Sequence, residues 1–281
     1  MESAPEVIMD AQNAVAVDVT LFIACYNEQD NILAAIANVV CAATAVGCSY
    51  DIVIIDDAST DHSVELIRGY MDAHPEVPIK LLINGTNQGL GTNYSEAAFH
   101  GRGVYYRLIV GDDEERRESI QAVLEQLGKA DMILTYHADT SHRSLSRRIV
   151  SRCFTAVVNL LSGNHLRYYN GLAVHRRHDV QRWHSHAHGF GFQADMITRL
   201  LDFGATYVEV PVVPKERTEG ASKAFTFRNI CSVSHTLLEI FIRRVARILY
   251  PKNFAKLANA PRSYETAAFR AGAGGNRPAS E

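Results

Sequence analysis

Four carboxylates stand in succession in the segment Gly111-Asp112-Asp113-Glu114-Glu115. The apolar residues before Gly111 predict the end of a buried strand, and the glycine lets the backbone turn sharply there. Like charges at this spacing repel one another unless a cation lies among them. Because Mg²⁺ and Mn²⁺ prefer oxygen ligands and usually keep substrate phosphates in their coordination shell, we expect a divalent metal on Asp112, Asp113 and Glu114. The alternative is a solvated loop that leads into a helix, whose first turn favours acidic residues.

Polar clusters also follow three earlier segments that predict strands. Val19–Cys25, Tyr50–Ile55 and Ile79–Ile83 are rich in apolar and β-branched residues, as is typical of strands buried on both faces. The polar clusters after them occupy residues 26–30, 56–61 and 84–91. Capping residues and apolar periodicity predict a helix after each cluster. Since ligands bind beyond the carboxyl ends of the strands in parallel sheets, we expect all of these clusters to converge on one rim with the acidic turn.

The second half of the chain continues the alternation of helices and strands. The patterns predict helices at 117–127, 142–161, 192–203 and 225–250, and strands at 131–136, 171–174 and 207–213. The fold class is therefore α/β, with a mainly parallel, Rossmann-like sheet flanked by helices. The last helix carries an apolar stripe from Leu237 to Leu249 beside Arg243, Arg244 and Arg247. That stripe faces the protein core, a second copy of the chain in a homodimer, or the headgroups of a membrane that the arginines would attract.

Composition and charge bound the domain organisation and the class of protein. We expect a loose leader at 1–17, one α/β domain at 18–228, an amphipathic helical extension at 229–258 and a disordered tail at 259–281. The net charge of −3 is not that of a nucleic-acid-binding protein, which would show a basic excess. No apolar run approaches the length of about 18 residues that a bilayer requires. Five cysteines without metal-site spacing and an acidic N-terminus favour a cytoplasmic protein, with peripheral contact at the inner face of the membrane as an extension.

Short motifs follow one another in a fixed order between about Thr20 and Asn229. Ala24-Cys-Tyr-Asn-Glu28 is similar to P-x-Y-N-E, Ile54-Ile-Asp-Asp-Ala-Ser-Thr-Asp61 to V-V-D-D-G-S-x-D, and Asn87-Gln-Gly-Leu-Gly91 to N-x-G-x-G. Further along, Gly189-Phe-Gly-Phe-Gln-Ala-Asp195 is similar to G-F-x-F-x-x-E, and Glu209-Val-Pro211 with Arg217-Thr-Glu-Gly-Ala-Ser-Lys223 to E-V-P followed by R-x-x-G-x-S-K. This ordered set resembles the family 2 glycosyltransferases of the GT-A fold, and within them the polyprenol-phosphate sugar synthases.

The resemblance implies an inverting transfer of a hexose from a UDP- or GDP-sugar to a polyprenyl phosphate. It places the nucleotide-sugar donor against Ala24, Tyr26, Glu28, Asp56, Asp57, Asn87, Gly89 and Lys223. Arg217 and Lys223 could close over the donor phosphates. One departure concerns the metal: Val110 stands where the family's D-x-D-x-Q turn has its first Asp, while Asp112 matches the second Asp and Glu114 the Gln. Asp113 could compensate for Val110, so dependence on Mg²⁺ or Mn²⁺ stays open.

The acceptor determines whether a general base is needed. A hydroxyl must lose its proton, and Asp195 or Asp113 is then the candidate base. A polyprenyl phosphate is already an anion, so Arg143, Arg147 and Arg148 would position its phosphate while Asp195 is structural or orienting. The catalytic candidates are therefore Asp112, Asp113, Asp195 and Arg217. The alternatives to lipid-phosphate transfer are a soluble transferase acting on a hydroxyl of a glycan or small metabolite, and a non-catalytic nucleotide-sugar-binding protein.

Overall fold

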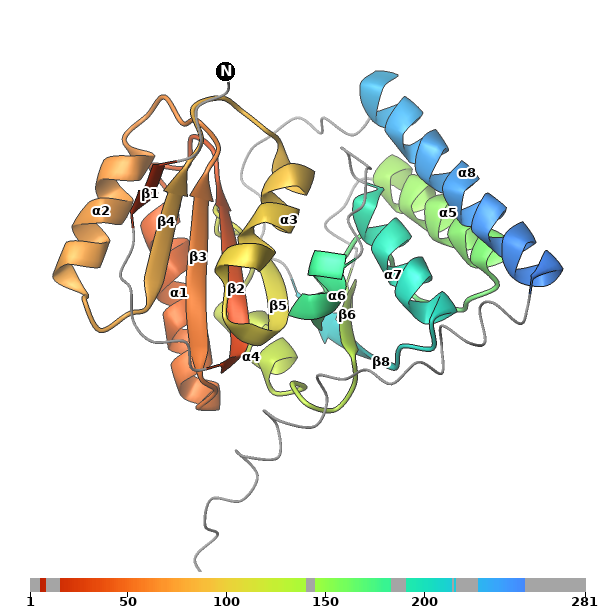
Figure 1. The fold of residues 1–281 in the computed structure, drawn as a ribbon, viewed down its shortest axis with the longest axis horizontal. Helices are drawn as coiled ribbons and strands as arrows, with labels where there is room; N and C mark the ends of the chain where they lie inside the picture. Colours follow the sequence, from red (N-terminus) through yellow and green to blue (C-terminus); the bar gives the residue numbers. More distant parts are fainter. Residues whose placement is uncertain are drawn as a thin grey trace, which may run out of the picture.

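The computed structural model describes residues 6–8, 16–139, 145–182, 191–213, 215 and 227–250. One eight-stranded sheet has the strand order β1-β4-β3-β2-β5-β7-β6-β8, and helices cover both of its faces (Figure 1). The strands are β1 (Glu6–Ile8), β2 (Val17–Cys25), β3 (Tyr50–Asp56), β4 (Ile79–Ile83), β5 (Gly103–Val110), β6 (Met132–His137), β7 (Val174–Arg176) and β8 (Tyr207–Val212). The helices are α1 (Ile32–Val46), α2 (Ser63–Ala73), α3 (Leu90–His100), α4 (Arg117–Leu124), α5 (Leu145–Ser162), α6 (Arg177–Arg182), α7 (Phe192–Asp202) and α8 (Phe227–Leu249). The predicted α/β class is confirmed.

Most neighbouring strands of the sheet run parallel. The four adjacent strands β4, β3, β2 and β5 are parallel, and so are β6 and β8. Strand β7 lies between these two groups and is antiparallel to both of its neighbours, pairing with β6 only through Ile133 and Val174. Since β5 and β6 therefore point the same way, the carboxyl ends of all six parallel strands lie at the same edge of the sheet.

Alternation along the central strands sends buried side chains to both faces of the sheet. Leu21 and Ile23 of β2 pack against α1, α2 and α4, whereas Phe22 packs with Tyr94 of α3 and Val180 of α6. A third cluster joins β6 to α5, α7 and α8. Burial on both faces explains why β2 reads as one continuous apolar run rather than an alternating one.

Strand β1 lies within the segment expected to be a loose leader. Its residues pair antiparallel with β4, with Val7 opposite Leu82. A strand of three residues carries too few positions to produce a periodic pattern, so the sequence did not predict it.

The start of β7 also differs from the prediction, which placed a strand at 171–174. The strand begins at Val174, and Gly171 instead lies close against β6. A Cβ atom on Gly171 would be 2.2 Å from the carbonyl oxygen of Thr135, so only glycine fits there. The sequence signal at Gly171 therefore marks a close backbone approach and not a strand.

Helix α8 corresponds to the predicted amphipathic extension. It begins at Phe227, two residues before the predicted boundary, and the predicted tail at 259–281 lies outside the described residues. Among the described helices, α8 included, none combines the length and apolar character that crossing a bilayer requires.

Candidate active site at the carboxyl edge of the sheet

The end of β2 fixes the position of the acidic turn. The backbone N–H of Gly111 donates to the carbonyl oxygen of Ala24 at 2.9 Å. A Cβ atom at position 111 would lie 2.7 Å from the same oxygen, which explains the glycine. The N–H of Asp57 donates to the carbonyl oxygen of Cys25, also at 2.9 Å. The turns that follow β3 and β5 therefore meet at the end of β2, as the sequence predicts.

Hydrogen bonds join the loop after β2 to the loop after β3. The N–H of Asn27 donates to Ser59 Oγ at 2.9 Å, and Asn27 Oδ1 accepts from the N–H of Thr60 at 2.8 Å. Asn27 has a φ of 56°, a left-handed conformation that asparagine adopts more readily than most residues. The side chain of Tyr26 is exposed beside this junction, so its ring is accessible to a ligand. Ala24 and Glu28 are partly buried at the same edge.

Asp56 and Asp57 are buried and already accept hydrogen bonds from the protein. Asp56 accepts from the N–H and Oγ of Ser59. Asp57 accepts from the N–H of Gln88 at 2.8 Å, from the N–H of Gly89 at 2.9 Å and from Asn84 Nδ2 at 2.9 Å. These bonds hold the loop before α3, in which Gly89 has a φ of 83° and the neighbouring Asn87 is exposed. Both carboxylates therefore build the rim, and a role as donor contacts remains a prediction.

The carboxylates of the acidic turn point in different directions. Asp113, with a φ of 54°, forms an ion pair with Lys215 and accepts from Asn38 Nδ2 at 2.7 Å. Asp112 and Glu114 instead line a cavity of about 330 Å³, which we call the acidic cavity and which Glu115 lines as well. The structure thus brings together two of the three predicted metal ligands and turns Asp113 away from them.

The acidic cavity suits a divalent ion that shares its ligands with a substrate. Among the residues that the structure describes, no group of three or more His, Cys, Asp and Glu side chains is placed to hold a metal. Mg²⁺ is nevertheless often bound through one or two carboxylates together with substrate phosphates. Asp112 and Glu114 both line the cavity and supply two carboxylates, so the residues present fit a metal that takes its other ligands from a substrate.

The fourth carboxylate of the turn, Glu115, is held by an ion pair with the buried Arg107. Arg107 of β5 is 0% exposed and forms an ion pair with Glu115, a contact that the sequence analysis did not foresee. Burial raises the pKa of Glu115, and the nearby Asp112 raises it further, whereas the Arg107 guanidinium lowers it. Because breaking a buried ion pair leaves an uncompensated charge, we regard Glu115 as the anchor of the turn rather than a metal ligand.

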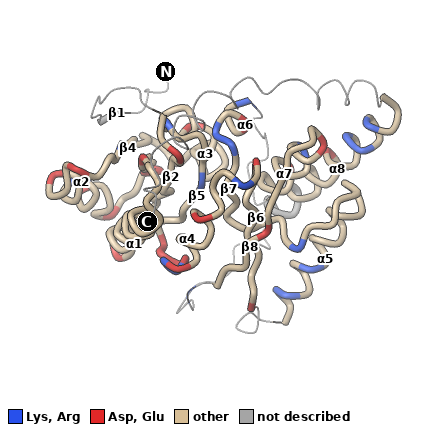
Figure 2. The backbone as a smooth tube through the Cα atoms, turned by 90° about the horizontal axis from the view of Figure 1, so that it is seen from below, with Lys and Arg blue, Asp and Glu red and all other residues tan. Residues whose placement is uncertain are grey.

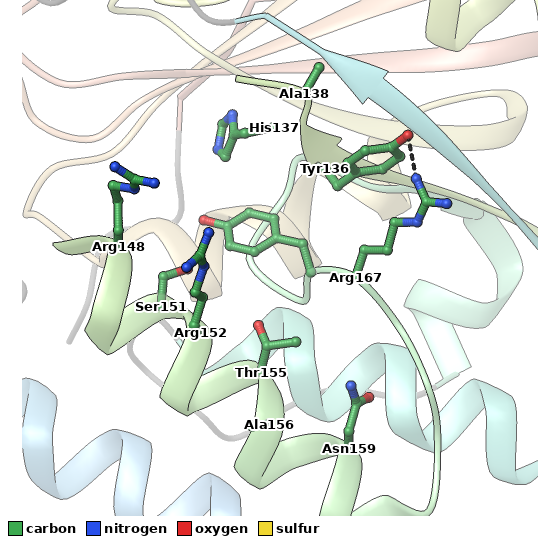
Figure 3. Close-up of a pocket in the computed structure, with 11 residues that line it drawn as sticks. Tyr136, His137, Ala138, Arg148, Ser151, Arg152, Thr155, Ala156, Asn159 and Arg167 are labelled. Carbon is green, nitrogen blue, oxygen red and sulfur yellow. Dashed lines mark hydrogen bonds between the residues drawn. The ribbon is translucent and has the colours of Figure 1, made fainter. Parts of the chain in front are cut away.

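A second cavity of about 470 Å³ adjoins the first, and among the residues that the structure describes its lining contains three arginines and no acidic residue (Figure 3). We call it the cationic cavity; Arg148, Arg152 and Arg167 line it. His137 at the end of β6 and Tyr168 line both cavities, and their rings meet edge to face with centroids 5.2 Å apart. These two rings therefore form a wall between an anionic and a cationic compartment.

One face of α5 supplies half of the cationic cavity. Its lining residues recur every three or four positions, as residues on one side of a helix do: Arg148, Ser151, Arg152, Thr155, Ala156 and Asn159. Of the predicted acceptor-binding arginines, Arg148 lines the cavity, Arg147 does not, and Arg143 lies outside the described residues. Arg152 was missed, although its spacing of four from Arg148 was a visible signal.

Arg167 closes the cationic cavity from the opposite side and was also missed. Its Nη1 donates to the hydroxyl of Tyr136 at 2.6 Å, and its guanidinium carbon lies 4.7 Å from the centre of that ring. The N–H of Arg167 donates to Glu209 Oε1 at 2.8 Å. Glu209 belongs to the quoted Glu209-Val-Pro211 motif, so one function of that motif is to hold the segment that carries Arg167.

Asp195 lies away from both cavities. Its carboxylate is 1% exposed and pairs with Arg243 of α8 and, at 3.4 Å, with Arg199. This geometry fits the structural role and argues against Asp195 as a general base, because a base must reach the acceptor proton. Arg217 and Lys223, predicted to close over the donor phosphates, lie outside the described part of the chain.

Several proteins of known structure share this fold. A mannosyltransferase from Pyrobaculum calidifontis in complex with GDP-mannose and Mn²⁺ superposes with a TM-score of 0.60 at 16% identity, covering 94% of this chain and 77% of that one. Glucosyl-3-phosphoglycerate synthase from Mycobacterium tuberculosis, in complex with Mn²⁺, UDP and glucosyl-3-phosphoglycerate, gives a TM-score of 0.53 at 13% identity, covering 81% and 80%. At these identities the likeness confirms the GT-A fold alone.

Sequence comparison adds curated relatives and a family. The chain is 26% identical over 207 residues to undecaprenyl-phosphate 4-deoxy-4-formamido-L-arabinose transferase of Edwardsiella ictaluri, covering 73% of this chain and 62% of that relative. The protein of the same name from Pectobacterium carotovorum is 24% identical over 238 residues, covering 83% and 70%. The chain thus spans about 62% of the length of the first relative. The family model described as glycosyl transferase family 2 matches residues 20–181, more than half of the chain. The chain therefore belongs to glycosyl transferase family 2.

Proposed function

We propose that the protein is an inverting glycosyltransferase that moves a hexose from a UDP- or GDP-sugar to a polyprenyl phosphate. The observation that carries the proposal is the pair of adjoining cavities, one lined by Asp112 and Glu114 and the other by arginines. A donor diphosphate that shares a divalent ion fits the first cavity, and an anionic acceptor fits the second. The names of the relatives, which are undecaprenyl-phosphate sugar transferases, support the lipid phosphate as acceptor.

The donor side needs positive charge that grows as the sugar–phosphate bond breaks. Asp112 and Glu114 would hold Mg²⁺ or Mn²⁺, which stabilises the leaving diphosphate without any proton transfer. The buried pair of Arg107 and Glu115 keeps the turn in position beneath them. The complexes of the mannosyltransferase and of the phosphoglycerate synthase with Mn²⁺ support a metal here. Tyr26, Asn87, Arg217 and Lys223 remain proposed contacts of the donor.

The acceptor side needs no base when the acceptor is a phosphate. An oxygen of the acceptor phosphate forms the new bond to the anomeric carbon while the bond from that carbon to the diphosphate oxygen breaks, and its electron pair leaves with the nucleoside diphosphate. Attack from the side opposite the leaving group inverts the anomeric centre. Arg148, Arg152 and Arg167 would hold the phosphate by charge-assisted hydrogen bonds. The burial of Asp195 in a structural ion pair agrees with a reaction that does not need it.

A cytoplasmic placement with peripheral contact at the inner face of the membrane is part of the same proposal. Cys25, Cys41, Cys48 and Cys153 are all unpaired, which is typical of a reducing compartment. A polyprenyl chain is insoluble in water, so an enzyme with this acceptor must meet a membrane surface.

A donor panel tests the proposal. The full chain is incubated with UDP- and GDP-sugars, Mg²⁺ or Mn²⁺, and a short polyprenyl phosphate, and the lipid-linked sugar is measured directly. We expect product from one donor, and Arg152→Ala should raise the KM for the acceptor about tenfold or more by removing a charged contact. Arg147→Ala is the matched control, since Arg147 is an arginine of the same helix that does not line the cavity. Hydrolysis of the donor without lipid product would point to a hydroxyl acceptor, and binding without any turnover would point to a nucleotide-sugar-binding protein.

A further inference from the structure

We infer that the outer face of α5 and α8 is a docking surface for a lipid bilayer that contains anionic headgroups. The inference rests on the proposed function, because a lipid-phosphate acceptor would reach the cationic cavity from this side. The two helices lie side by side at one edge of the molecule (Figure 1). We call their shared outer surface the α5–α8 face.

Helix α8 has its apolar side turned outward, opposite to an ordinary surface helix. Large apolar side chains recur every three or four residues and are exposed: Leu238, Phe241, Ile242, Val245, Ile248 and Leu249. Ile248 is 67% exposed, whereas Ile240 and Thr236 on the inner side are buried. An apolar stripe of this length on a single helix is larger than the scattered exposed residues that a water-facing surface normally shows.

Three arginines of α8, Arg243, Arg244 and Arg247, bind groups of the neighbouring helices and anchor α8 in this orientation. Arg243 pairs with Asp195 and donates to Thr198 Oγ1 at 2.7 Å, while Arg247 pairs with Asp202 at 2.9 Å. Arg244 donates to the carbonyl oxygen of Ser162 in α5 at 3.3 Å. The polar side of the helix is therefore held against α5 and α7, so the apolar side stays exposed. Attraction of a bilayer by the arginines of α8 themselves stays a prediction, since these three guanidinium groups also bind partners within the protein.

Helix α5 extends the apolar surface and connects it to the cationic cavity. Leu145, Ile149 and Leu160 are exposed along one side of the helix, and Leu160 is 82% exposed. Arg152 and Ala156 lie between this side and the cavity side, since both are exposed and both line the cavity. A ligand with a phosphate in the cavity and a long hydrocarbon chain would therefore lay that chain along the α5–α8 face.

The basic charge of α5, at the edge of the α5–α8 face, favours an anionic bilayer over a second copy of the chain as the partner of this face. Helix α5 contains Arg147, Arg148 and Arg152 and no acidic residue, as Figure 2 shows by its uniformly blue charges. In a two-fold dimer through this face the same patch would meet itself, and the α5 arginines would come close to their own copies. Anionic lipid headgroups attract such a cluster, while the apolar stripe enters the boundary between headgroups and acyl chains.

Flotation with vesicles tests the docking surface. The full chain is mixed with phosphatidylcholine vesicles with or without phosphatidylglycerol, and we expect it to float with the anionic vesicles. Ile242→Glu combined with Leu249→Glu should lower the bound fraction about tenfold or more, because two large apolar side chains can no longer be buried. Phe99→Glu combined with Leu33→Glu is the matched control, since both side chains are exposed and apolar and belong to α3 and α1, which lie away from α5 and α8 (Figure 1). Circular dichroism and the melting temperature verify that each variant is folded.

Turnover of a short, water-soluble prenyl phosphate separates this inference from the proposed function. If both hold, Ile242→Glu/Leu249→Glu keeps turnover in solution and loses turnover of long polyprenyl phosphate in vesicles. Flotation of the wild type without turnover of any prenyl phosphate would sink the proposed function and leave the docking surface standing. Turnover in solution without flotation would overturn the docking surface alone. A dimer that the double variant converts to a monomer, again without flotation, would show that a second copy covers this face and would equally overturn it.

Discussion

Lys215 forms an ion pair with Asp113 and so turns this carboxylate of the acidic turn away from the cavity that Asp112 lines. The pair joins residues 102 positions apart in the chain, and Asn38 of α1 holds the same carboxylate from a third segment. Two adjacent aspartates therefore have different environments, one facing ligand space and the other facing the protein.

Substitution of these two aspartates should have unequal effects. We expect Asp112→Asn to lower kcat about a hundredfold or more, because it removes charge stabilisation on the donor side. Asp113→Asn should change kcat little, since the Lys215 pair is partly exposed and such pairs contribute about 0–1 kcal/mol to stability. Lipid-linked product and the concentration of Mn²⁺ at half-maximal rate would be measured for each. Full turnover by Asp112→Asn would refute its assignment as a metal ligand.

The ring of Tyr168 should keep water that enters the cationic cavity out of the acidic cavity, where the donor is proposed to bind. In Tyr168→Ala the two cavities would join, so we expect more donor hydrolysis per sugar transferred. Tyr168→Phe keeps the ring and should retain the wild-type ratio. Free sugar and lipid-linked sugar would be counted in the same reaction. An unchanged ratio in Tyr168→Ala would mean that the wall does not exclude water.

Asp195 should matter for folding and not for proton transfer. Asp195→Asn breaks a buried ion pair with Arg243, and breaking such a pair typically costs about 3–5 kcal/mol of the free energy of unfolding. Because Arg243 keeps a second buried partner, Asp202 at 3.6 Å, we expect a loss at the lower end of that range. The folded protein should keep its kcat and the pH dependence of kcat. Glu239→Gln in α8 is the control, because Glu239 pairs only with the exposed His235 among the ion pairs described. A stable Asp195→Asn protein with a strongly reduced kcat would restore Asp195 as a base candidate.

Protonation of His175 in the unfolded chain should lower the free energy of unfolding in mild acid. Burial lowers its pKa from 6.5 to about 4, so the unfolded chain takes up a proton at a pH where the folded chain does not. The free energy of unfolding should therefore fall as the pH drops from about 6.5 to about 4, by about 3 kcal/mol in total. Urea unfolding at several pH values should show a flatter dependence for His175→Gln than for the wild type. His165→Gln, at an exposed position, should leave the dependence unchanged.

The sequence predicted those features that depend on local pattern. Buried runs such as Val19–Cys25 gave the central strands, and the position of each polar cluster after a strand placed the clusters on one rim. The hydrogen bonds from Asn27 to the loop after β3 and from Gly111 to Ala24 confirm that convergence. Strand ends determine this arrangement, and strand ends are visible in the order of apolar and polar residues.

The direction of individual side chains depended on partners that the pattern does not reveal. Lys215 determines the direction of the Asp113 side chain. Arg243, at a separation of 48 residues, determines that of Asp195. Arg167 reached the cationic cavity because Glu209 and Tyr136 hold it, and Arg107 looked like one polar residue in an apolar strand. Ion pairs between distant segments therefore determined which predicted site residues face ligand space.

Strands β7 and β6 are joined by fewer residue pairs than any other two neighbouring strands of the described sheet. The strands on the β5 side carry the acidic turn, and those on the β6 side lead into α5 and its arginines, while β6 holds β7 through the single pair of Ile133 and Val174. A sheet rotates most easily where its ladder is shortest, so relative motion of the two halves would be concentrated at this line. Such a rotation would change the width of the acidic cavity, because Asp112 lies on the β5 side of the line while His137 and Val212 lie on the β6 side. The width of the acidic cavity would thus depend on the junction of the sheet that has the fewest paired residues.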